Sequence, residues 1–452
     1  MVRYVDWFEN IKKSDPEVFD AIKNEVARQR NGLEMIPSEN FTSISVLEAL
    51  GSVMTNKYSE GYAGKRYYGG NEYVDVIERL AVERAKKLFA VPHANVQPYS
   101  GSPANLAVYL ALCKPGDTIM GLNLTDGGHL THGWKTSVSG QIFKSVPYHV
   151  KKDGYIDIDE ARKLAQESKP KLIWIGATAY TRELPFEDFA QIANDVGAYL
   201  VADISHISGL IVSGVHKSPA KHAHLITTTT HKTLRGPRGA MIMVTDKGVE
   251  KDPALPGKID STIFPGLQGG PHDSAVAGIA IALLEASKPS FREYGVQIVN
   301  NSKALAAELM RNGITLVTGG TDNHMLLIDL TGFGKGTGVF VQDALGKAGI
   351  TVNKNTIPNE PSSPFYPSGI RLGTPALTTM GMKEDDMRKV GAMIARVIND
   401  VKGYQLPESK EERAAYLEKF RRELDERQEI KDVRKEVLDL CSNFTLYPQI
   451  KI

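Results

Sequence analysis

The sequence predicts an α/β fold, with a large domain built on a mainly parallel sheet and a smaller α+β domain after it. Short runs that are apolar on both faces alternate with helical and loop segments, which is typical of parallel strands buried between helices. The chain has 452 residues, more than one ordinary domain. No repeat of roughly 20 to 50 residues is visible, which excludes solenoids and propellers.

The predicted elements of the large domain follow one another in a regular order. Ile77, Ala81, Ala85 and Leu88 recur at steps of three or four, which predicts a helix with one buried face over residues 75–88. Short apolar runs after this helix predict buried strands. These runs span residues 118–122, 171–177, 199–203, 224–228 and 239–245.

The pattern changes after a long helical stretch around residues 279–307, and this change predicts the second domain. Further apolar runs predict strands at residues 324–330, 350–354 and 369–375. Apolar residues then recur at helical spacing from Met387 to Val401, and a highly charged segment with helical propensity follows at 408–434. We therefore expect an N-terminal helical arm over 1–30, a large domain over 31–285 and a small C-terminal domain over 286–452.

Composition excludes several classes of protein. Hydrophobic residues make up 42% and charged residues 24% of the chain, with a formal net charge of +1, so we expect a globular enzyme without a nucleic-acid partner. Cys113 and Cys441 lie far apart without CxxC or Cys/His spacing, which argues against disulfides and a zinc site. The start, MVRYVDWFEN, lacks an apolar signal segment, and no run approaches the ~18 apolar residues of a spanning helix. We expect a cytoplasmic location and no membrane partner.

The first candidate for chemistry is Lys232, which comes just past a predicted strand and next to His231 in ITTTTHKTLRGPRGA. A lysine there could form a Schiff base with an aldehyde cofactor. Alone it is weak evidence, because most surface lysines simply lie in solvent and threonine runs are common at strand ends.

Asp203 supplies a partner for that lysine. It ends the apolar run YLVAD, and His206 follows three residues later. Ligands of open α/β sheets bind outside the carboxyl ends of the strands. An aspartate at that place could keep the pyridine nitrogen of pyridoxal 5'-phosphate (PLP) protonated, so that the ring accepts electrons. The plainer alternative is a helix N-cap, and a metal site lacks a third ligand at suitable spacing.

A third element is a helix start that could hold a phosphate. Ser100, Gly101 and Ser102 stand directly before a helical pattern, with Pro103 at the first helical position. Free backbone N–H groups, the positive end of the helix dipole and serine hydroxyls suit an anion. Many helices begin this way without a ligand.

Together these segments resemble the serine hydroxymethyltransferase family of PLP enzymes, from about Trp7 to Val401. One matching stretch might arise by chance, but seven in the family's order would not. They are IPSENFTS (36–43), TNKYSEGYAGKRYYGG (55–70), GGHLTHG (127–133), TTTTHKTLRGPRG (227–239), FPGLQGGP (264–271), GGTDNH (319–324) and SGIRLGTPALT (368–378). The resemblance implies the fold type I, aminotransferase-like architecture: an α/β large domain with a mainly parallel sheet and a smaller α+β C-terminal domain.

The resemblance also implies roles around the cofactor. Lys232 would be the Schiff-base lysine, Asp203 the partner of the pyridine nitrogen and His129 the ring stacked on PLP. His206 would lie beside the cofactor ring and His231 would influence reaction specificity. Thr229 is a further candidate catalytic residue, and the other implied cofactor contacts are Ser100, Gly101, Ser102, Thr178, Tyr58 and Gly270. Without the family, each histidine would be read as an ordinary core or surface residue.

For the amino-acid substrate, the resemblance implies that Arg371 binds the carboxylate with help from Ser38, and that Glu60 is an acid/base residue. A planar guanidinium suits a carboxylate because it can donate two parallel hydrogen bonds. Tyr58, Tyr68 and Gly270 match positions that reach across a subunit interface, with Tyr68 among the substrate-binding residues. The implied assembly is a homodimer with shared active sites, and a tetramer is possible.

Tetrahydrofolate is the implied co-substrate, and the implied reaction transfers the hydroxymethyl group of serine to it reversibly, leaving glycine. The matching folate-contacting positions are Leu124, Gly128, His129, Leu130, Asn353, Ser363, Pro364 and Phe365. Two positions depart from the family. Pro103 replaces the common glutamine and removes one N–H near the phosphate, and Thr178 replaces a serine, keeping its hydroxyl and adding a methyl group.

Other functions stay open at this point. A related PLP aldolase would cleave 3-hydroxy amino acids without folate, and a related transferase would prefer an α-methylated serine. A catalytically silent scaffold that binds RNA through its charged C-terminal helix belongs to a different class. Intact Lys232, Asp203, Glu60 and Arg371 argue against a silent protein.

Overall fold

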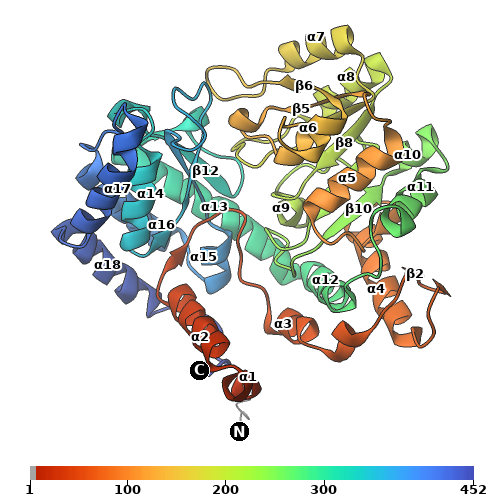
Figure 1. Ribbon diagram of the computed structural model, residues 1–452, viewed down its shortest axis with the longest axis horizontal. Helices are drawn as coiled ribbons and strands as arrows, with labels where there is room; N and C mark the ends of the chain where they lie inside the picture. The colour runs from red at the N-terminus through yellow and green to blue at the C-terminus, as the bar shows by residue number, and fades with distance from the viewer. Residues whose placement is uncertain (1–6, 452) are drawn as a thin grey trace.

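The computed structural model describes residues 7–451. The first six residues of the predicted arm, which are also part of the start expected to lack a signal segment, lie outside the described residues. Figure 1 shows two groups of helices and strands side by side, one from the orange-to-green part of the chain and one from the cyan-to-blue part. Separate clusters of buried apolar residues form their cores. Within residues 7–451, no helix is both long and apolar enough to span a membrane.

A seven-stranded sheet forms the centre of the first group, in the order β4-β10-β9-β8-β7-β5-β6. β10 runs antiparallel to both of its neighbours, and the other pairs are parallel. The five predicted strands are confirmed as β5 (Thr118–Leu122), β7 (Leu172–Ile175), β8 (Tyr199–Asp203), β9 (Leu225–Thr229) and β10 (Ala240–Val244). They are the most buried strands of the sheet because helices cover both faces.

The two outer strands of this sheet were not predicted. β4 (His93–Asn95) has three residues, too few to show a pattern. β6 (Lys144–Tyr148) is an edge strand with mostly half-buried or exposed residues and a proline, and edge strands tolerate proline because one side of the backbone needs no partner.

Helices of the first group cover the sheet. The predicted helix at 75–88 is confirmed as α4 (Glu72–Phe89), which buries Ala81 and Ala85. The other helices longer than one turn are α3 (Ile44–Leu50), α5 (Gly101–Leu112), α6 (Val138–Ile142), α7 (Ile158–Ser168), α8 (Phe186–Val196), α9 (Ser208–Val212), α10 (Asp246–Lys251), α11 (Leu255–Ser261) and α12 (Asp273–Ala286).

The predicted helical stretch around 279–307 is confirmed, and two helices share it. α12 ends at Ala286 and α13 (Pro289–Arg311) begins after two connecting residues. Pro289 takes the first position of α13, where its missing N–H would have no helical partner and its fixed φ favours a new start.

An antiparallel four-stranded sheet lies in the second group, in the order β11 (Thr315–Leu316), β12 (Met325–Asp329), β15 (Gly369–Gly373), β14 (Asn353–Asn355). The predicted strand at 350–354 is divided: β13 (Ile350–Thr351) leaves this sheet and pairs with β1 (Leu33–Glu34) instead. The surrounding helices are α14 (Gly338–Lys347), α15 (Pro375–Met380) and α16 (Glu384–Val401).

The charged C-terminal segment is helical, as predicted, but it forms two helices that pack on the second group. α17 (Lys410–Leu424) buries Leu417 and Phe420, and α18 (Gln428–Cys441) buries Val433 and Val437. The apolar residues of each helix therefore face the core while the charges face solvent.

The N-terminal arm forms α1 (Glu9–Ser14) and α2 (Pro16–Arg30), and it packs against the other end of the chain. The guanidinium of Arg30 donates hydrogen bonds to the carbonyls of Leu446, Tyr447 and Ile450. Figure 1 accordingly shows both termini at the same edge of the molecule.

Candidate active site

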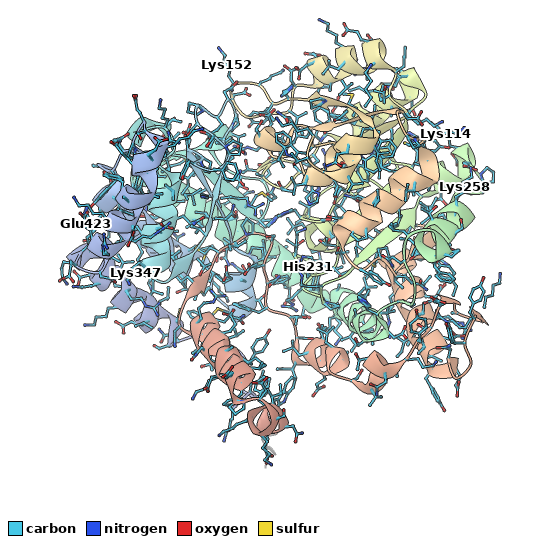
Figure 2. The ribbon with its side chains drawn as sticks, in the orientation of Figure 1. Lys114, Lys152, His231, Lys258, Lys347 and Glu423 are labelled. Atoms are coloured by element: carbon cyan, nitrogen blue, oxygen red, sulfur yellow. The ribbon has the colours of Figure 1, made fainter. Side chains whose placement is uncertain are left out.

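The carboxyl ends of β8 and β9 bring Asp203, His206, Thr229 and Lys232 together. These strands are parallel, with Asp203 opposite Thr227, so the residues that follow both strands emerge at one edge of the sheet. His231, labelled near the middle of the molecule in Figure 2, marks this place. A small cavity lies there, lined by Gly101, His129, His132, Ala177, Thr178, Asp203, Ser205, His206, Thr229 and Lys232.

Asp203 is held as a carboxylate by three donors. Asn105 donates through Nδ2 to Oδ2 (2.9 Å), His132 Nε2 lies 3.2 Å from the same oxygen, and the Ser205 N–H donates to Oδ1 (3.0 Å). Burial alone would raise the pKa of Asp203, but the hydrogen bond and charge of His132, with His129 and Ser205, hold that pKa well below its usual range. Asp203 can therefore keep a nearby basic nitrogen protonated.

Lys232 carries its amine into the same cavity. Its Nζ donates to Thr229 Oγ1 (3.1 Å). Burial lowers the pKa of Lys232 to about 8, against an opposing effect of Asp203 and with help from the positive charges of Arg371 and Arg238. A larger share of this amine is neutral at physiological pH than of an ordinary lysine, and the neutral amine is the nucleophile that attacks an aldehyde.

Burial favours the neutral form of three imidazoles at the cavity, those of His129, His206 and His231. Burial lowers the pKa of His129 to about 4 and that of His231 to about 3, and it holds the pKa of His206 well below its usual range. The charge of Lys232 acts in the same direction on all three. A neutral ring at His129 suits stacking against an aromatic ligand because it adds no charge next to the Asp203 carboxylate.

The N-terminus of α5 faces the cavity and can hold an anion. Ser100 is the N-cap, but among the described residues its side chain caps no backbone N–H, so the first amides of the helix remain available. A Cβ on Gly101 would stand 2.8 Å from Thr229 Cγ2, which leaves room for glycine alone. The residues present thus fit PLP: an anion site, a partner for a protonated ring nitrogen and a nucleophilic lysine.

Pro103 is the third residue of α5, and the predicted first position is wrong. The helix begins earlier because Gly101 and Ser102 already have helical geometry. An N–H at the third position would have no partner within the helix, so proline costs the helix no hydrogen bond there.

Arg371 approaches the cavity from β15. Its Nη1 donates to the Thr178 carbonyl (2.5 Å) and its Nε to Asn353 Oδ1 (3.0 Å). The Thr178 hydroxyl donates to the carbonyl of Gly128 (3.0 Å), so it is already engaged by the loop that carries His129. The segment that carries Ser38 runs beside β15, because the Gly373 N–H donates to the Met35 carbonyl (2.7 Å).

Comparison with known proteins agrees with this geometry. A family model described as serine hydroxymethyltransferase matches residues 11–394. A serine hydroxymethyltransferase of Acidothermus cellulolyticus is 55% identical over 389 residues, which cover 86% of this chain and 89% of the relative. This chain belongs to the serine hydroxymethyltransferase family.

Membership confirms the predicted fold type I class and the predicted activity. The enzyme is a transferase of one-carbon metabolism that moves the hydroxymethyl group of serine to tetrahydrofolate reversibly and leaves glycine. The family thus accounts for a site that joins a nucleophilic lysine to an arginine able to bind a carboxylate.

A second group of predicted residues lies apart from Lys232. Tyr58 donates through its hydroxyl to Glu60 Oε1 (3.2 Å), and its ring lies 5.0 Å from that of Tyr68. Tyr58 lies beside Gly269 and Gly270, and Glu60 lies beside Gly269. None of them lines the Lys232 cavity described above. The hairpin after Glu60, formed by β2 (Gly61–Tyr62) and β3 (Lys65–Arg66), lies at the edge of the molecule in Figure 1, away from His231 in Figure 2.

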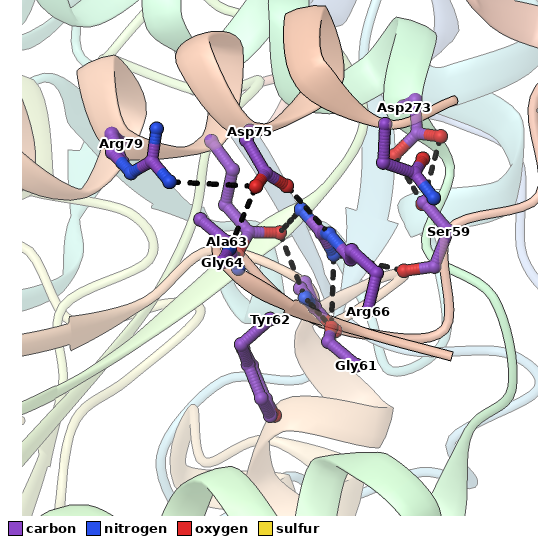
Figure 3. Close-up of polar contacts among 12 residues, drawn as sticks. Ser59, Gly61, Tyr62, Ala63, Gly64, Arg66, Asp75, Arg79 and Asp273 are labelled. Atoms are coloured by element: carbon purple, nitrogen blue, oxygen red, sulfur yellow. Dashed lines mark hydrogen bonds and ion pairs between the residues drawn. The ribbon is translucent and has the colours of Figure 1, made fainter. Parts of the chain in front are cut away.

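A buried ion-pair network shapes this hairpin, as Figure 3 shows. Arg66 donates through Nε to Asp75 Oδ1 (2.9 Å) and through Nη2 to Glu78 Oε2 (3.0 Å), both on α4. Its Nη1 donates to the carbonyls of Ser59 (2.8 Å) and Gly61 (2.9 Å). Arg66 therefore fixes the backbone on both sides of Glu60.

The residues that match folate contacts do not share one cavity, and His129 lines the Lys232 cavity itself. Leu130 lines an apolar cavity of about 560 Å³, together with Tyr99, Ser102 and Pro103. Pro364 lines a polar cavity of about 420 Å³ with His149 and Glu360 among its walls. Leu124 begins the short 3-10 turn Leu124–Asp126. Ser363 and Phe365 flank Pro364 in the sequence, and the Phe365 side chain is 80% exposed.

Sequence reasoning missed His132, Asn105 and His324. His132 and Asn105 both bond Asp203, and His324 Nε2 lies 3.3 Å from His206 Nδ1. His132 and His324 lie in stretches that carried the resemblance, and Asn105 lies in the helix that follows the predicted phosphate site. Only the fold brings them to their partners, because 71 and 98 residues separate His132 and Asn105 from Asp203, and 118 separate His324 from His206.

Proposed function

We propose that this enzyme holds PLP covalently on Lys232, with the phosphate at Ser100, Gly101 and Ser102, and that it draws part of each active site from a second subunit. The observation that carries the proposal is the convergence of Lys232, Asp203 and the uncapped start of α5 on one cavity. Asp203 would face the pyridine nitrogen and His129 the ring plane, with Thr178, His206, His231 and Thr229 around them.

PLP, when bound, supplies a conjugated ring that takes up the electron pair released as the Cα–Cβ bond of serine breaks. The protein's part is electrostatic. Asp203 keeps its negative charge because Asn105, His132 and Ser205 stabilise it, and that charge keeps a proton on the facing nitrogen. Removing any of these donors would raise the pKa of Asp203, so the carboxylate would compete more strongly for the proton of that nitrogen.

Arg371 would bind the carboxylate of serine and Ser38 would assist it. Burial lowers the pKa of Arg371 to about 10, so the guanidinium is still charged at neutral pH. Its bonds to Asn353 and the Thr178 carbonyl fix the plane of the guanidinium before substrate arrives. A preset plane favours two parallel hydrogen bonds to a carboxylate and therefore one orientation of the amino acid.

Glu60 would act as an acid/base residue in the site of a partner subunit, with Tyr58, Tyr68 and Gly270 reaching the same site. Support comes from the surface of α4, where Tyr73, Val76 and Leu80 form an apolar stripe that is 72%, 49% and 42% exposed. Stripes of this kind are commonly covered by another protein surface. A second copy over α4 would also bring Glu60 and the hairpin that follows it into contact with that copy, in a homodimer or in a tetramer made of two such dimers.

Tetrahydrofolate would lie between Leu124, Gly128, His129, Leu130 and Asn353 on one side and Ser363, Pro364 and Phe365 on the other. Asn353 supports this placement, because it touches Arg371 and so adjoins the amino-acid site.

We also propose a cytoplasmic location, and a division into the arm 1–30, the large domain 31–285 and the small domain 286–452. Separate core clusters support that division, although Leu33 and Met35 pack in the C-terminal core.

The test is the absorbance spectrum of the purified, PLP-loaded enzyme with glycine, before and after adding tetrahydrofolate. We expect a long-wavelength band that grows strongly with the folate, because proton removal from glycine is then coupled to the co-substrate. A spectrum indifferent to folate would instead favour a folate-independent aldolase.

A further inference from the structure

The turn that carries Lys232 is held at both ends by one segment from elsewhere in the chain. The Arg235 N–H donates to the Lys232 carbonyl (3.0 Å) and closes the turn. Asn40 donates through Nδ2 to the same carbonyl (3.0 Å), and Thr42 donates through Oγ1 to the Arg235 carbonyl (2.9 Å). Residues 40 and 42 therefore fix the first and last carbonyls of the turn.

Every hydrogen-bonding position of the Asn40 amide is used. Nδ2 also donates to the Tyr294 hydroxyl (2.7 Å), while Oδ1 accepts from the Phe41 N–H (2.9 Å) and from Thr379 Oγ1 (2.7 Å). The partners fix which atom is nitrogen, because the Phe41 N–H can only donate and the Lys232 carbonyl can only accept. Asn40 thus ties Lys232 to α13, through Tyr294, and to α15, through Thr379.

The turn needs such support because its backbone is unfavourable. Arg235 has φ +60°, a left-handed conformation that side-chain-bearing residues rarely adopt. Its guanidinium lies 4.6 Å from the centre of the Tyr294 ring, the same tyrosine that accepts from Asn40. Strained turns of this kind persist where surrounding contacts hold them.

The position of the Lys232 amine depends on this backbone. Thr229 Oγ1 is its one hydrogen-bond partner among the described residues, so the direction of the long side chain is set mainly where it leaves the turn. Ser38 lies two residues before Asn40, so the same segment fixes the distance between the proposed carboxylate site and the lysine.

We propose that Asn40 is a positioning residue that holds the Lys232 backbone, through its amide, at the place from which the amine reaches the cofactor. The inference rests on the proposed role of Lys232 as the residue that binds PLP. Asn40 does not touch the cofactor cavity itself, so it acts through Lys232.

Asn40→Asp tests this directly. The carboxylate keeps the shape of the side chain and can still accept from Phe41 and Thr379, but it places an oxygen against the Lys232 carbonyl. We expect the dissociation constant of PLP from the holoenzyme to rise about 10- to 100-fold, because the Lys232 carbonyl loses a buried hydrogen bond and the amine is displaced. The pH midpoint of the visible absorbance of lysine-bound cofactor should shift as well.

Asn301→Asp is the matched control. Asn301 is fully buried, donates through Nδ2 to Thr378 Oγ1 (2.9 Å) and to the Met382 carbonyl (2.9 Å), and makes no contact with Lys232 in the described structure. Asn301 lies on α13 and bonds Thr378 of α15 and Met382 just after it, so Asn301→Asp also removes buried amide donors. Its effect on PLP binding measures what such a loss does without a change at Lys232. Thr42→Val removes the second support of the turn without adding charge and should change PLP affinity in the same direction, by less.

The inference holds if Asn40→Asp and Thr42→Val weaken PLP binding and shift the spectral midpoint while Asn301→Asp, at comparable thermal stability, does neither. It is overturned if all three variants behave alike, or if Asn40→Asp retains the wild-type affinity and midpoint. A wild-type enzyme without lysine-bound cofactor would instead contradict the proposed function.

Discussion

His132 Nε2 lies 3.2 Å from Asp203 Oδ2, and the His132 ring stacks on Trp174 with centroids 5.1 Å apart and planes 11° from parallel. The stack fixes the ring in the plane that points its nitrogen at the carboxylate. Asn105 bonds the same oxygen from α5, the helix whose start is the proposed phosphate site. The charge of Asp203 and the anion site are therefore held by one connected set of contacts.

Asp203→Asn should leave the fold intact and remove the charge that we propose faces the cofactor nitrogen. The amide cannot keep that nitrogen protonated, and the loss of a hydrogen bond to a charged group costs about 1.5–3 kcal/mol, or about 10- to 100-fold in PLP affinity. Turnover should fall further, because the ring then accepts electrons poorly. Fluorescence titration with PLP and the initial rate with serine and tetrahydrofolate measure the two effects. A variant with wild-type turnover would exclude the assigned role.

The rate at which PLP attaches to the cofactor-free enzyme should depend on pH through Lys232. Its pKa is lowered to about 8, and attack requires the neutral amine, so the rate should rise with pH and level off above about 8. At pH 7, about one amine in ten is then neutral, against fewer than about one in a thousand for an ordinary lysine. Stopped-flow absorbance measures this profile. A rate that keeps rising toward pH 10 would mean that burial does not perturb the amine.

Arg66→Ala should destabilise the protein far more than loss of an exposed ion pair. Arg66, Asp75 and Glu78 have side chains that are 4%, 13% and 5% exposed. The variant leaves Glu78 without a cation and Asp75 with only the more distant Arg79, at 3.4 Å. Breaking such a network costs about 3–5 kcal/mol. Urea denaturation gives the free energy of unfolding.

Arg162→Ala is the control for that measurement. Arg162 pairs with Asp195 at 3.1 Å, and both side chains are 35% exposed. Exposed pairs contribute about 0–1 kcal/mol, so this variant should stay close to wild type. Equal losses of unfolding free energy in Arg66→Ala and Arg162→Ala would show that burial does not make the Arg66 ion pairs more important for stability.

Subunit exchange between Lys232→Ala and Glu60→Ala should restore activity that neither variant has alone. If Glu60 serves the partner's site, a mixed dimer contains one site with both residues intact and one with neither. Random exchange makes about half of the dimers mixed, so about a quarter of the sites should recover. Activity after mixing, set against each variant alone, measures this. No recovery would mean that Glu60 acts within its own subunit.

The sequence predicts the centre of this protein better than its edges. β8 and β9 are short and begin with apolar residues, so their positions are visible without a structure, together with Asp203 at the end of β8 and Lys232 just after β9. The pairing of β1 with β13 is not visible, because these two-residue strands are more than 300 residues apart and too short to show a pattern.

The same limit applies to the site. Lys232, Asp203 and Arg371 stand out because their residue types suit the chemistry, and the family supplies their roles. Asn40 and His132 act through hydrogen bonds to residues 192 and 71 positions away, and an asparagine or histidine in a loop carries no signal of such a bond. The separation of Glu60 from the Lys232 cavity becomes visible only when the hairpin is placed in space.

The most direct test of the central claim is to reduce the PLP-loaded enzyme with borohydride and map the labelled peptide by mass spectrometry. Reduction makes the bond between PLP and its lysine permanent, so the label identifies the residue. We predict a pyridoxyl group on Lys232 in the wild-type enzyme and no labelled lysine at the site in Lys232→Ala. A label on another lysine, or an unchanged cofactor spectrum in Lys232→Ala, would contradict the site described above.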